Sequence, residues 1–192
     1  LRDTAQTYPD IDIFLGEEIQ SWTQAHDRVD LKSTQRRICS RYAIACDGAS
    51  SPTRKALEIS WRDLGYSHDW LVVDAEVNSK NTLPNDVLQV CDPDRLHTFV
   101  ATKDPFRRWE FRLNPGEKAD DMMRDKTIHS LLSAWTPRES YEIRRKAVYQ
   151  FHAAVAEKWR IGNIFLAGDA AHQMPPFIGQ GMNTGLRDVL NL

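Results

Sequence analysis

The chain has 192 residues, a formal net charge of −2 and 41% hydrophobic residues, which is typical of a soluble globular protein. This charge balance offers no basic surface for nucleic acid or an anionic membrane. No stretch of about 18 uncharged apolar residues and no signal peptide is apparent, so a cytoplasmic location is expected. The three cysteines form no CxxC pair and the six histidines show no paired spacing, so neither a disulfide nor a metal site is predicted.

The first part of the chain reads as short strands joined by turns, for example over residues 11–15 and 28–32. The apolar run over residues 42–46 predicts a buried strand, which ends at Asp47. A helix is expected over residues 52–57, because a proline that follows a serine is a common first helical residue. An acidic side chain is therefore expected at the exit of a strand.

The middle of the chain predicts an antiparallel sheet interrupted by one helix. Trp109 and Phe111 alternate with Arg108 and Glu110, and this period of two predicts a strand with one packed face and one face in water. The predicted elements are strands over residues 70–77, 87–91, 96–102, 107–113 and 145–152, and a helix over residues 119–134.

The most informative stretch is an apolar strand that begins near Asn163 and runs directly into Gly168 and Asp169. Ligands of open α/β sheets bind beyond the carboxyl ends of the strands. The carboxylate of Asp169 can accept hydrogen bonds from sugar hydroxyls, and the small residues Gly168 and Ala170 leave room for a ligand beside the backbone. This strand end therefore predicts a site for a polyol.

A loop and a helix follow this strand. A proline pair that ends at Pro176 stiffens the loop, and Gly179 and Gly181 free the chain for unusual dihedral angles before a helix that begins near Met182. The first free N–H groups, including those of Met182 and Asn183, would point the positive end of the helix dipole at an electron-rich ring. The helix is expected to bury an apolar face formed by Met182, Leu186, Val189 and Leu190.

Two motifs, CDGASSPTR at residues 46–54 and GDAAHQMPPFIGQGMN at residues 168–183, resemble those of flavin-dependent aromatic hydroxylases of the para-hydroxybenzoate hydroxylase type. The chain looks most like the branch that hydroxylates 3-(3-hydroxyphenyl)propionate. The resemblance implies an α/β fold, α+β within this chain, of an FAD- and NAD(P)-binding flavoprotein monooxygenase with an inserted antiparallel-sheet substrate domain. Residues 1–59 and 151–192 would belong to the FAD-binding domain and residues 60–150 to the substrate domain.

The resemblance also assigns roles to residues. Asp169 would bind the ribityl chain of FAD, and the backbone at Met182 and Asn183 would face the pyrimidine edge of the flavin. Asp47 would lie near the pyrophosphate and the approach of the pyridine nucleotide. The residues implied in cofactor binding are Asp47, Gly48, Arg54, Gly168, Asp169, Ala170, Pro176, Gly179, Gly181, Met182 and Asn183.

The implied reaction uses NAD(P)H and O2 to hydroxylate a small aromatic acid on FAD, while the protein positions the ring and excludes water. No catalytic acid or base is identified, and His172 is expected to be a hydrogen-bonded structural residue. None of the nine glycines forms the GxGxxG turn that holds the ADP half of FAD in such enzymes. The chain is therefore expected to be a central fragment that binds FAD weakly. A homo-oligomer is left open.

Plainer interpretations remain at this stage. Asp169 could cap the following turn, the Asp47-Gly48 pair could be an ordinary turn, and Arg54 could be a solvated helix arginine. The whole protein could instead be another flavoprotein of the same superfamily, such as a quinone-biosynthesis hydroxylase or a reductase. It could also be a non-catalytic β-rich binding module.

Overall fold

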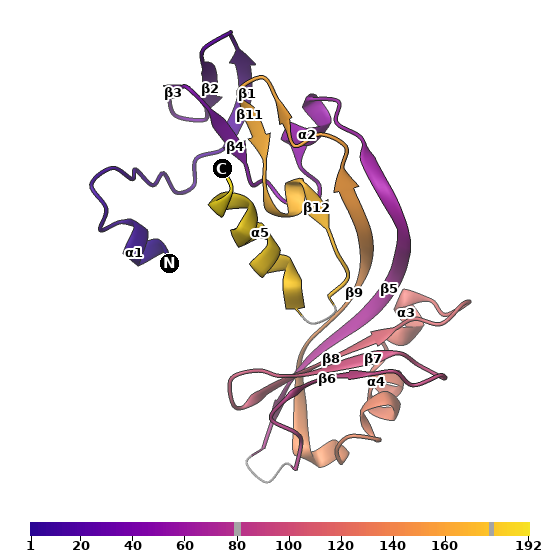
Figure 1. Cartoon of the computed structure of the whole chain (residues 1–192). Helices are drawn as coiled ribbons and strands as arrows, with labels where there is room; N and C mark the ends of the chain where they lie inside the picture. Colours follow the sequence, from indigo (N-terminus) through magenta and orange to yellow (C-terminus); the bar gives the residue numbers. More distant parts are fainter. Residues whose placement is uncertain (79–81, 177–178) are drawn as a thin grey trace.

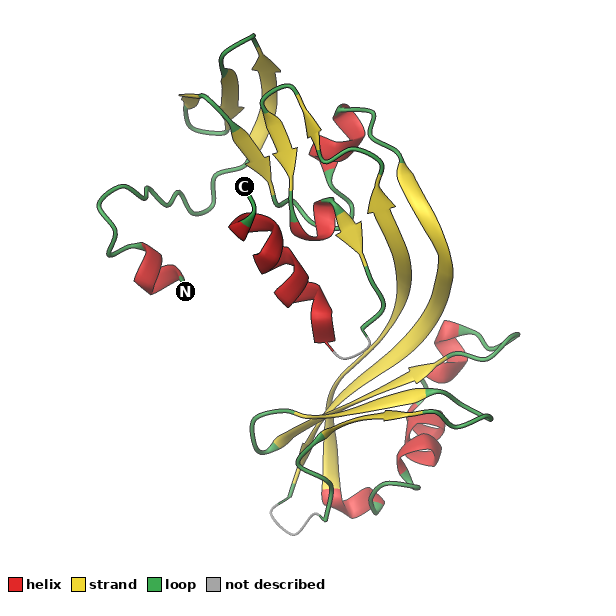
Figure 2. Ribbon diagram, viewed as in Figure 1, coloured by secondary structure: helices red, strands yellow, loops and turns green. Residues whose placement is uncertain are grey.

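The computed structural model describes residues 1–78, 82–176 and 179–192 (Figure 1). Phe177 and Ile178 of the second motif therefore lie outside the described residues. Strands in three sheets dominate, and the helix at the N-terminus, Arg2–Ala5, stands apart from them (Figure 2). Both helix and sheet are thus present, as expected for this fold class. Within the described ranges, the structure contains no helix with the length and apolar character needed to cross a membrane.

The first sheet is a three-stranded antiparallel meander in the order β1-β2-β3. The strand expected over residues 28–32 is confirmed. The strand expected over residues 11–15 is wrong, because no neighbouring strand in the described part of the chain pairs with this segment, which is a mostly exposed loop. The elements of this region are α1 (Arg2–Ala5), β1 (Ile19–Gln24), β2 (Val29–Ser33) and β3 (Arg37–Ser40).

The second sheet joins segments that lie far apart in the chain, in the order β10-β11-β4. Strands β4 (Ala43–Ala45) and β11 (Ile164–Leu166) run parallel, and β10 (Arg160–Ile161) pairs with β11 in the antiparallel sense. Helix α2 (Pro52–Ala56) follows β4, as the proline after a serine predicts. A small core forms beneath this sheet and includes Val29, Leu57, Ile59, Ala156, Ile164, Leu166, Ala170 and Ala171.

The third sheet has six strands in the order β12-β9-β5-β8-β7-β6. Its two central strands are long, 17 residues in β5 and 16 in β9, and they curve from the region of the two small sheets to the far end of the molecule (Figure 1). All the strands predicted for the middle of the chain are present. They are β5 (Trp61–Val77), β6 (Val87–Val90), β7 (His97–Ala101), β8 (Phe106–Arg112) and β9 (Tyr141–Ala156), to which β12 (His172–Gln173) adds at the edge.

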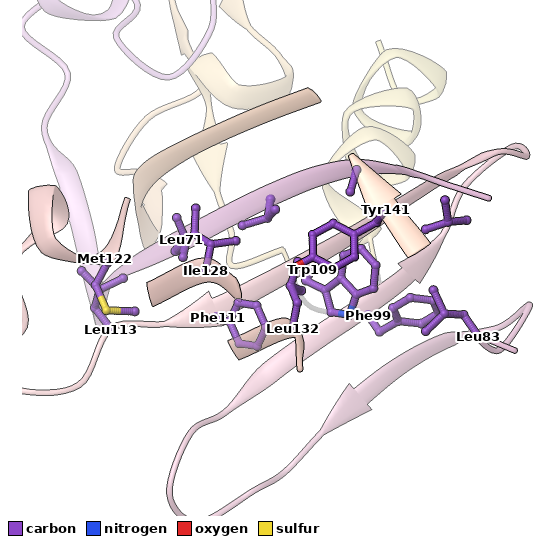
Figure 3. Packing of buried hydrophobic residues seen from close by; sticks show 13 residues of the cluster. Leu71, Leu83, Phe99, Trp109, Phe111, Leu113, Met122, Ile128, Leu132 and Tyr141 are labelled. Carbon is purple, nitrogen blue, oxygen red and sulfur yellow. The ribbon is translucent and has the colours of Figure 1, made fainter. Parts of the chain in front are cut away.

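One face of the third sheet carries the main hydrophobic core (Figure 3). Leu71 and Trp109 from the sheet pack with Ile128 and Leu132 of helix α4 (Asp125–Leu132), and all four side chains are fully buried. Complete burial of a large aliphatic or aromatic side chain contributes about 1.5–3 kcal/mol. This core therefore fixes the helical layer on one face of the sheet and leaves the other face free for different contacts.

The single helix expected over residues 119–134 is wrong. The segment forms two helices, α3 (Ala119–Met122) and α4, and Arg124 between them has an extended backbone with ψ of 137°. The hydroxyl of Thr127 donates to the carbonyl of Asp121 at 2.9 Å, which stabilises the break. A short 3-10 helix, η1 (Arg138–Ser140), then leads into β9.

The expected alternation in β8 is only half correct. Trp109 and Phe111 face the core as predicted, but Glu110 on the opposite face is 6% exposed and not in water. Arg107 is also buried at 3% exposure and donates to the carbonyl of Phe106 at 2.8 Å. By the strand register Arg107 lies on the core face and Glu110 on the opposite face, so each face of this strand holds one buried charged residue.

The last helix, α5 (Gln180–Leu190), begins two residues earlier than expected. Its predicted buried face is wrong, because Met182, Leu186, Val189 and Leu190 are all exposed. Met182 is 73% exposed and Leu186 is 52% exposed, because no described element covers this side of α5. The helix is attached to the rest of the molecule through its other side.

Candidate functional site

The two motifs meet at one edge of the second sheet. In the parallel pair, Leu166 lies opposite Ala45, and the backbone N–H of Ala167 donates to the carbonyl of Ala45 at 3.0 Å. Asp47 and Asp169 each follow within a few residues of these strand ends. Because the strands are adjacent and parallel, both acidic residues leave the sheet at its carboxyl edge, where ligands bind in open α/β sheets.

Asp47 organises its own loop. Its Oδ1 accepts a hydrogen bond from the Ser51 hydroxyl, and its Oδ2 accepts one from the Thr53 N–H at 3.0 Å. Partial burial acts to raise the pKa of Asp47, but the hydrogen bonds from Ser51 and Thr53 outweigh it and hold the pKa below its ordinary value. Gly48 follows with a φ of +81°, which a residue with a side chain rarely adopts.

Ser51 links this loop to helix α2. Its buried hydroxyl accepts a hydrogen bond from the Arg54 N–H at 2.9 Å, so Ser51 is the N-cap of the helix. The capped helix then holds the loop of Asp47 and Gly48 in one shape. A cavity of about 840 Å³ lies beside this loop and is lined by Asp47, Thr53, residues of β4 and residues of β1. Asp169 is not among its lining residues.

Replacing Ser51 with alanine is expected to lower the free energy of unfolding by about 1–2 kcal/mol, since it removes an N-cap acceptor and a donor to Asp47. Urea unfolding followed by circular dichroism measures this. The neighbouring Ser50 is exposed and gives the control variant Ser50→Ala, which should change stability by less than about 0.5 kcal/mol. Equal losses in the two variants would contradict the capping role.

Arg54 lies inside the fold, so the alternative of a solvated helix arginine is wrong. It is 6% exposed, and its guanidinium carbon lies 4.1 Å from the centre of the Trp61 ring. Its Nη1 lies 3.4 Å from the carbonyl of Ile59, and its Nε has no partner among the described residues. Arg54 therefore ties α2 to the start of β5 by a cation–π contact.

Asp169 differs from Asp47 because its carboxylate is free. It lies in the 3-10 helix η2 (Gly168–Ala170), is exposed, and accepts no hydrogen bond within the described ranges. The alternative that Asp169 caps the following turn is therefore wrong. Gly168 before it has a φ of +60°, and a side chain built there would meet no atom within 4 Å. The backbone beside Asp169 is thus open to a ligand.

Asp188 of α5 holds the helix against this turn by hydrogen bonds, and no sequence pattern predicted this role. Its Oδ2 accepts from the Gly168 N–H at 2.8 Å and lies 2.7 Å from Nε2 of His172. The side chains of His172 and Asp188 are only 6% and 8% exposed. His172 is therefore a hydrogen-bonded structural residue, as predicted.

Gly185 makes the close approach of α5 possible. A Cβ built on Gly185 would lie 3.3 Å from the Cα of Gly168, tighter than an ordinary van der Waals contact. A glycine inside a helix costs about 1 kcal/mol relative to alanine, so its presence in a helical pattern is a signal for such a contact. Asp188 gave no comparable signal, since its partners lie 16 and 20 residues away in the sequence.

Helix α5 starts after a glycine in a left-handed conformation. Gly179 precedes the helix in the left-handed conformation, with φ of 62°, and its N–H donates to the carbonyl of Pro176 at 3.0 Å. Because the helix begins at Gln180, its first-turn N–H groups include those of Gly181 and Met182. Asn183 is the fourth residue of α5, and its contact with the flavin edge stays a prediction.

The second face of the third sheet, opposite α3 and α4, carries polar and aromatic side chains. Pairing across the strands places Thr98, Glu110, Val72 and Ala147 in one row of this second face. The adjacent row brings Arg108 of β8 and Arg145 of β9 to Asp74 of β5, with Arg108 Nε at 2.6 Å from Asp74 Oδ1. Further along, the rings of Tyr149 and Phe151 stack with centroids 6.1 Å apart. In Figure 1, α5 and the helices α3 and α4 lie on different sides of this sheet.

These residues fit a flavin nucleotide. Sugar-alcohol hydroxyls need an acceptor without a partner, which Asp169 provides, and a close approach of ligand to backbone, which Gly168 and Gly181 allow. The positive end of α5 suits an electron-rich ring edge.

Comparison with known proteins supports the same assignment. The FAD binding domain family matches residues 1–192. The 3-(3-hydroxy-phenyl)propionate/3-hydroxycinnamic acid hydroxylase of Burkholderia cenocepacia (strain HI2424) is 35% identical over 100% of this chain and 36% of its own length. The enzyme of that name from Escherichia coli O139:H28 (strain E24377A / ETEC) is 32% identical over 96% of this chain and 34% of its own length. The chain thus spans about a third of the curated relatives that it matches.

Solved structures agree. A ternary complex of aklavinone-11 hydroxylase with FAD and aklavinone superimposes with a TM-score of 0.79 at 25% identity, covering 91% of this chain and 36% of that one. The p-nitrophenol 4-monooxygenase of Pseudomonas putida DLL-E4 has the same fold, with a TM-score of 0.84 at 20% identity over 98% of this chain and 50% of the other. The chain therefore belongs to the FAD binding domain family and is similar over its length to FAD-dependent aromatic hydroxylases.

Proposed function

We propose that the protein is a flavin-dependent monooxygenase that hydroxylates a phenolic aromatic acid, such as 3-(3-hydroxyphenyl)propionate, with NAD(P)H and O2. The single observation that carries the proposal is the free carboxylate of Asp169, which follows the carboxyl end of β11. The loop of Asp47 follows the carboxyl end of the adjacent parallel strand, β4. The names of the relatives at 32–35% identity support the substrate class.

In this proposal Asp169 accepts hydrogen bonds from the ribityl hydroxyls of FAD, and Gly168 allows the chain of the cofactor to pass close to the backbone. The first-turn N–H groups of α5, including that of Met182, stabilise negative charge at the pyrimidine edge. When bound, FAD supplies the electron transfer from NAD(P)H and the reaction with O2. Asp47 and Gly48 shape the loop near the pyrophosphate, while Arg54 acts indirectly by fixing α2.

The other residues proposed to bind the cofactor act through the shape of the turn and of the loop before α5. Ala170 is buried and keeps the turn small, Pro176 and Gly179 close the loop before α5, and Gly181 leaves its first turn without a side chain. The proposal also has the pyridine nucleotide approach at the loop of Asp47. A cytoplasmic location, where NAD(P)H is available, is part of the same proposal.

The second face of the third sheet is proposed to hold the substrate. Arg145 of this face is 55% exposed and attracts an anion, and the stacked pair Tyr149 and Phe151 offers aromatic surface to a ring. On this basis residues 60–150 form a substrate domain between two parts of the FAD-binding domain, residues 1–59 and 151–192. Strand β9 runs continuously across the proposed boundary at residue 150.

The experiment is a turnover assay of the FAD-loaded enzyme with NADH or NADPH and a panel of phenolic acids under ¹⁸O₂. Mass spectrometry should find one labelled oxygen atom in a catechol product of the preferred acid. Oxidation of the nicotinamide without a labelled product, for every acid tested, would favour a reductase of the same superfamily. A protein that binds no flavin at all would contradict the proposal and favour a non-catalytic binding module.

A further inference from the structure

Glu110 is a buried acid that no structural role explains. Its side chain is 8% exposed, in the middle of the second face of the third sheet, between Val72 of β5 and Thr98 of β7. Its carboxylate oxygens are not among the fully buried atoms without a partner, so a donor from outside the protein can reach them. In the part of the chain that the structure describes, no group donates a hydrogen bond to this carboxylate.

The neighbouring polar groups are engaged elsewhere. Arg108 donates through Nε and Nη2 to Asp74, at 2.6 and 3.1 Å, and its Nη1 comes no closer than 4.0 Å to Oε1 of Glu110. The hydroxyl of Thr98 donates to Oε1 of Gln89 at 2.9 Å. The side chains that could have neutralised Glu110 are therefore held by other partners, and its oxygens remain available to a ligand.

This arrangement lowers stability. Burial raises the pKa of Glu110, an effect that Arg108 partly offsets and Asp74 reinforces. Because the folded state holds the proton more tightly than the unfolded state, the contribution of Glu110 to stability falls as the pH rises through its folded pKa. A buried acid whose pKa is raised in this way is a candidate for a functional role.

We propose that Glu110 is a specificity residue that accepts a hydrogen bond from the hydroxyl group of a phenolic ligand bound on the second face of the sheet. The ligand class is an aromatic ring that carries a hydroxyl, seated between Glu110 and the aromatic pair Tyr149 and Phe151 on the same face. The inference rests on the proposed function and deepens it, because it names the phenolic hydroxyl as the substrate group that Glu110 recognises. A carboxylate acceptor rejects a ring without the hydroxyl, since the buried acid is then left without a donor.

The test measures equilibrium binding of 3-(3-hydroxyphenyl)propionate and of 3-phenylpropionate to the FAD-loaded protein by calorimetry. The wild type should prefer the hydroxylated acid by about tenfold or more, as expected for a hydrogen bond to a charged group. Glu110→Met, which keeps the length of the side chain and removes its oxygens, should abolish this preference. Glu110→Gln, which keeps a neutral acceptor, should retain part of it.

The matched control is Glu142→Gln, an exposed acid on β9 whose side chain is 67% exposed and paired with Arg144. It should leave the preference unchanged. Thermal unfolding of the same proteins at neutral pH separates binding from folding, because Glu110→Gln is expected to unfold at a temperature equal to or above that of the wild type. A wild-type preference that persists in Glu110→Met overturns the inference alone, whereas a wild type that binds neither acid overturns the proposed function.

Discussion

Replacing Asp188 with alanine is expected to lower the free energy of unfolding by about 2–5 kcal/mol, because two buried donors lose their acceptor together. The Gly168 N–H and the ring of His172 both contact one oxygen of Asp188, and both side chains of the His172–Asp188 pair are more than nine-tenths buried. Each orphaned donor costs about 1–3 kcal/mol. Guanidinium unfolding of the variant and the wild type measures the loss.

The controls for this prediction lie on the same chain. Asp188→Asn keeps one carbonyl oxygen in place and should lose less stability than Asp188→Ala. Asp120 is exposed, and within the described ranges its side chain makes no hydrogen bond or ion pair, so Asp120→Ala should shift stability by less than about 0.5 kcal/mol. A loss below about 1 kcal/mol in Asp188→Ala would show that α5 is held mainly by other contacts.

Asp169→Ala is expected to weaken FAD binding by about tenfold to a hundredfold with little change in folding stability. The reason is that the carboxylate of Asp169 has no partner among the described residues, so its removal breaks nothing in the fold. A hydrogen bond to a charged group contributes about 1.5–3 kcal/mol, and 1.4 kcal/mol corresponds to tenfold in affinity. Titration of the apoprotein with FAD, followed by flavin fluorescence, gives the dissociation constants.

Asp47→Ala is the informative comparison for this second prediction. Both oxygens of Asp47 are occupied by Ser51 and Thr53, so this variant should lose stability as well as FAD affinity. Asp169→Ala should therefore separate binding from folding, and Asp47→Ala should not. If Asp169→Ala binds FAD as tightly as the wild type, the carboxylate does not contact the cofactor.

Local sequence patterns predicted the elements with strong apolar signals. The runs that became β4, β5 and β8 were visible because branched and aromatic residues cluster in them. Strands β1 and β3 escaped notice because most of their residues are polar and exposed. The run over residues 11–15 failed for the opposite reason, since it is apolar but pairs with no strand in the part of the chain that the structure describes.

Some residues of the candidate site could be predicted from local sequence, and others could not. Asp47 and Asp169 could be found because each follows an apolar strand, and a strand exit is a local feature. Asp188 could not be found, since its importance depends on contacts across the fold. Glu110 was expected to face water because the alternation in β8 predicts only which face a side chain occupies, and not what covers that face.

The long strands β5 and β9 have a consequence for folding cooperativity. They pair with each other from Trp61 opposite Ala156 to Val77 opposite Tyr141, and both ends of this ribbon belong to hydrophobic cores. Melting of either core would fray backbone hydrogen bonds that the other core also needs. The molecule is therefore expected to unfold in one cooperative transition. A substitution that destabilises one core should also destabilise the other, because the paired strands β5 and β9 connect them.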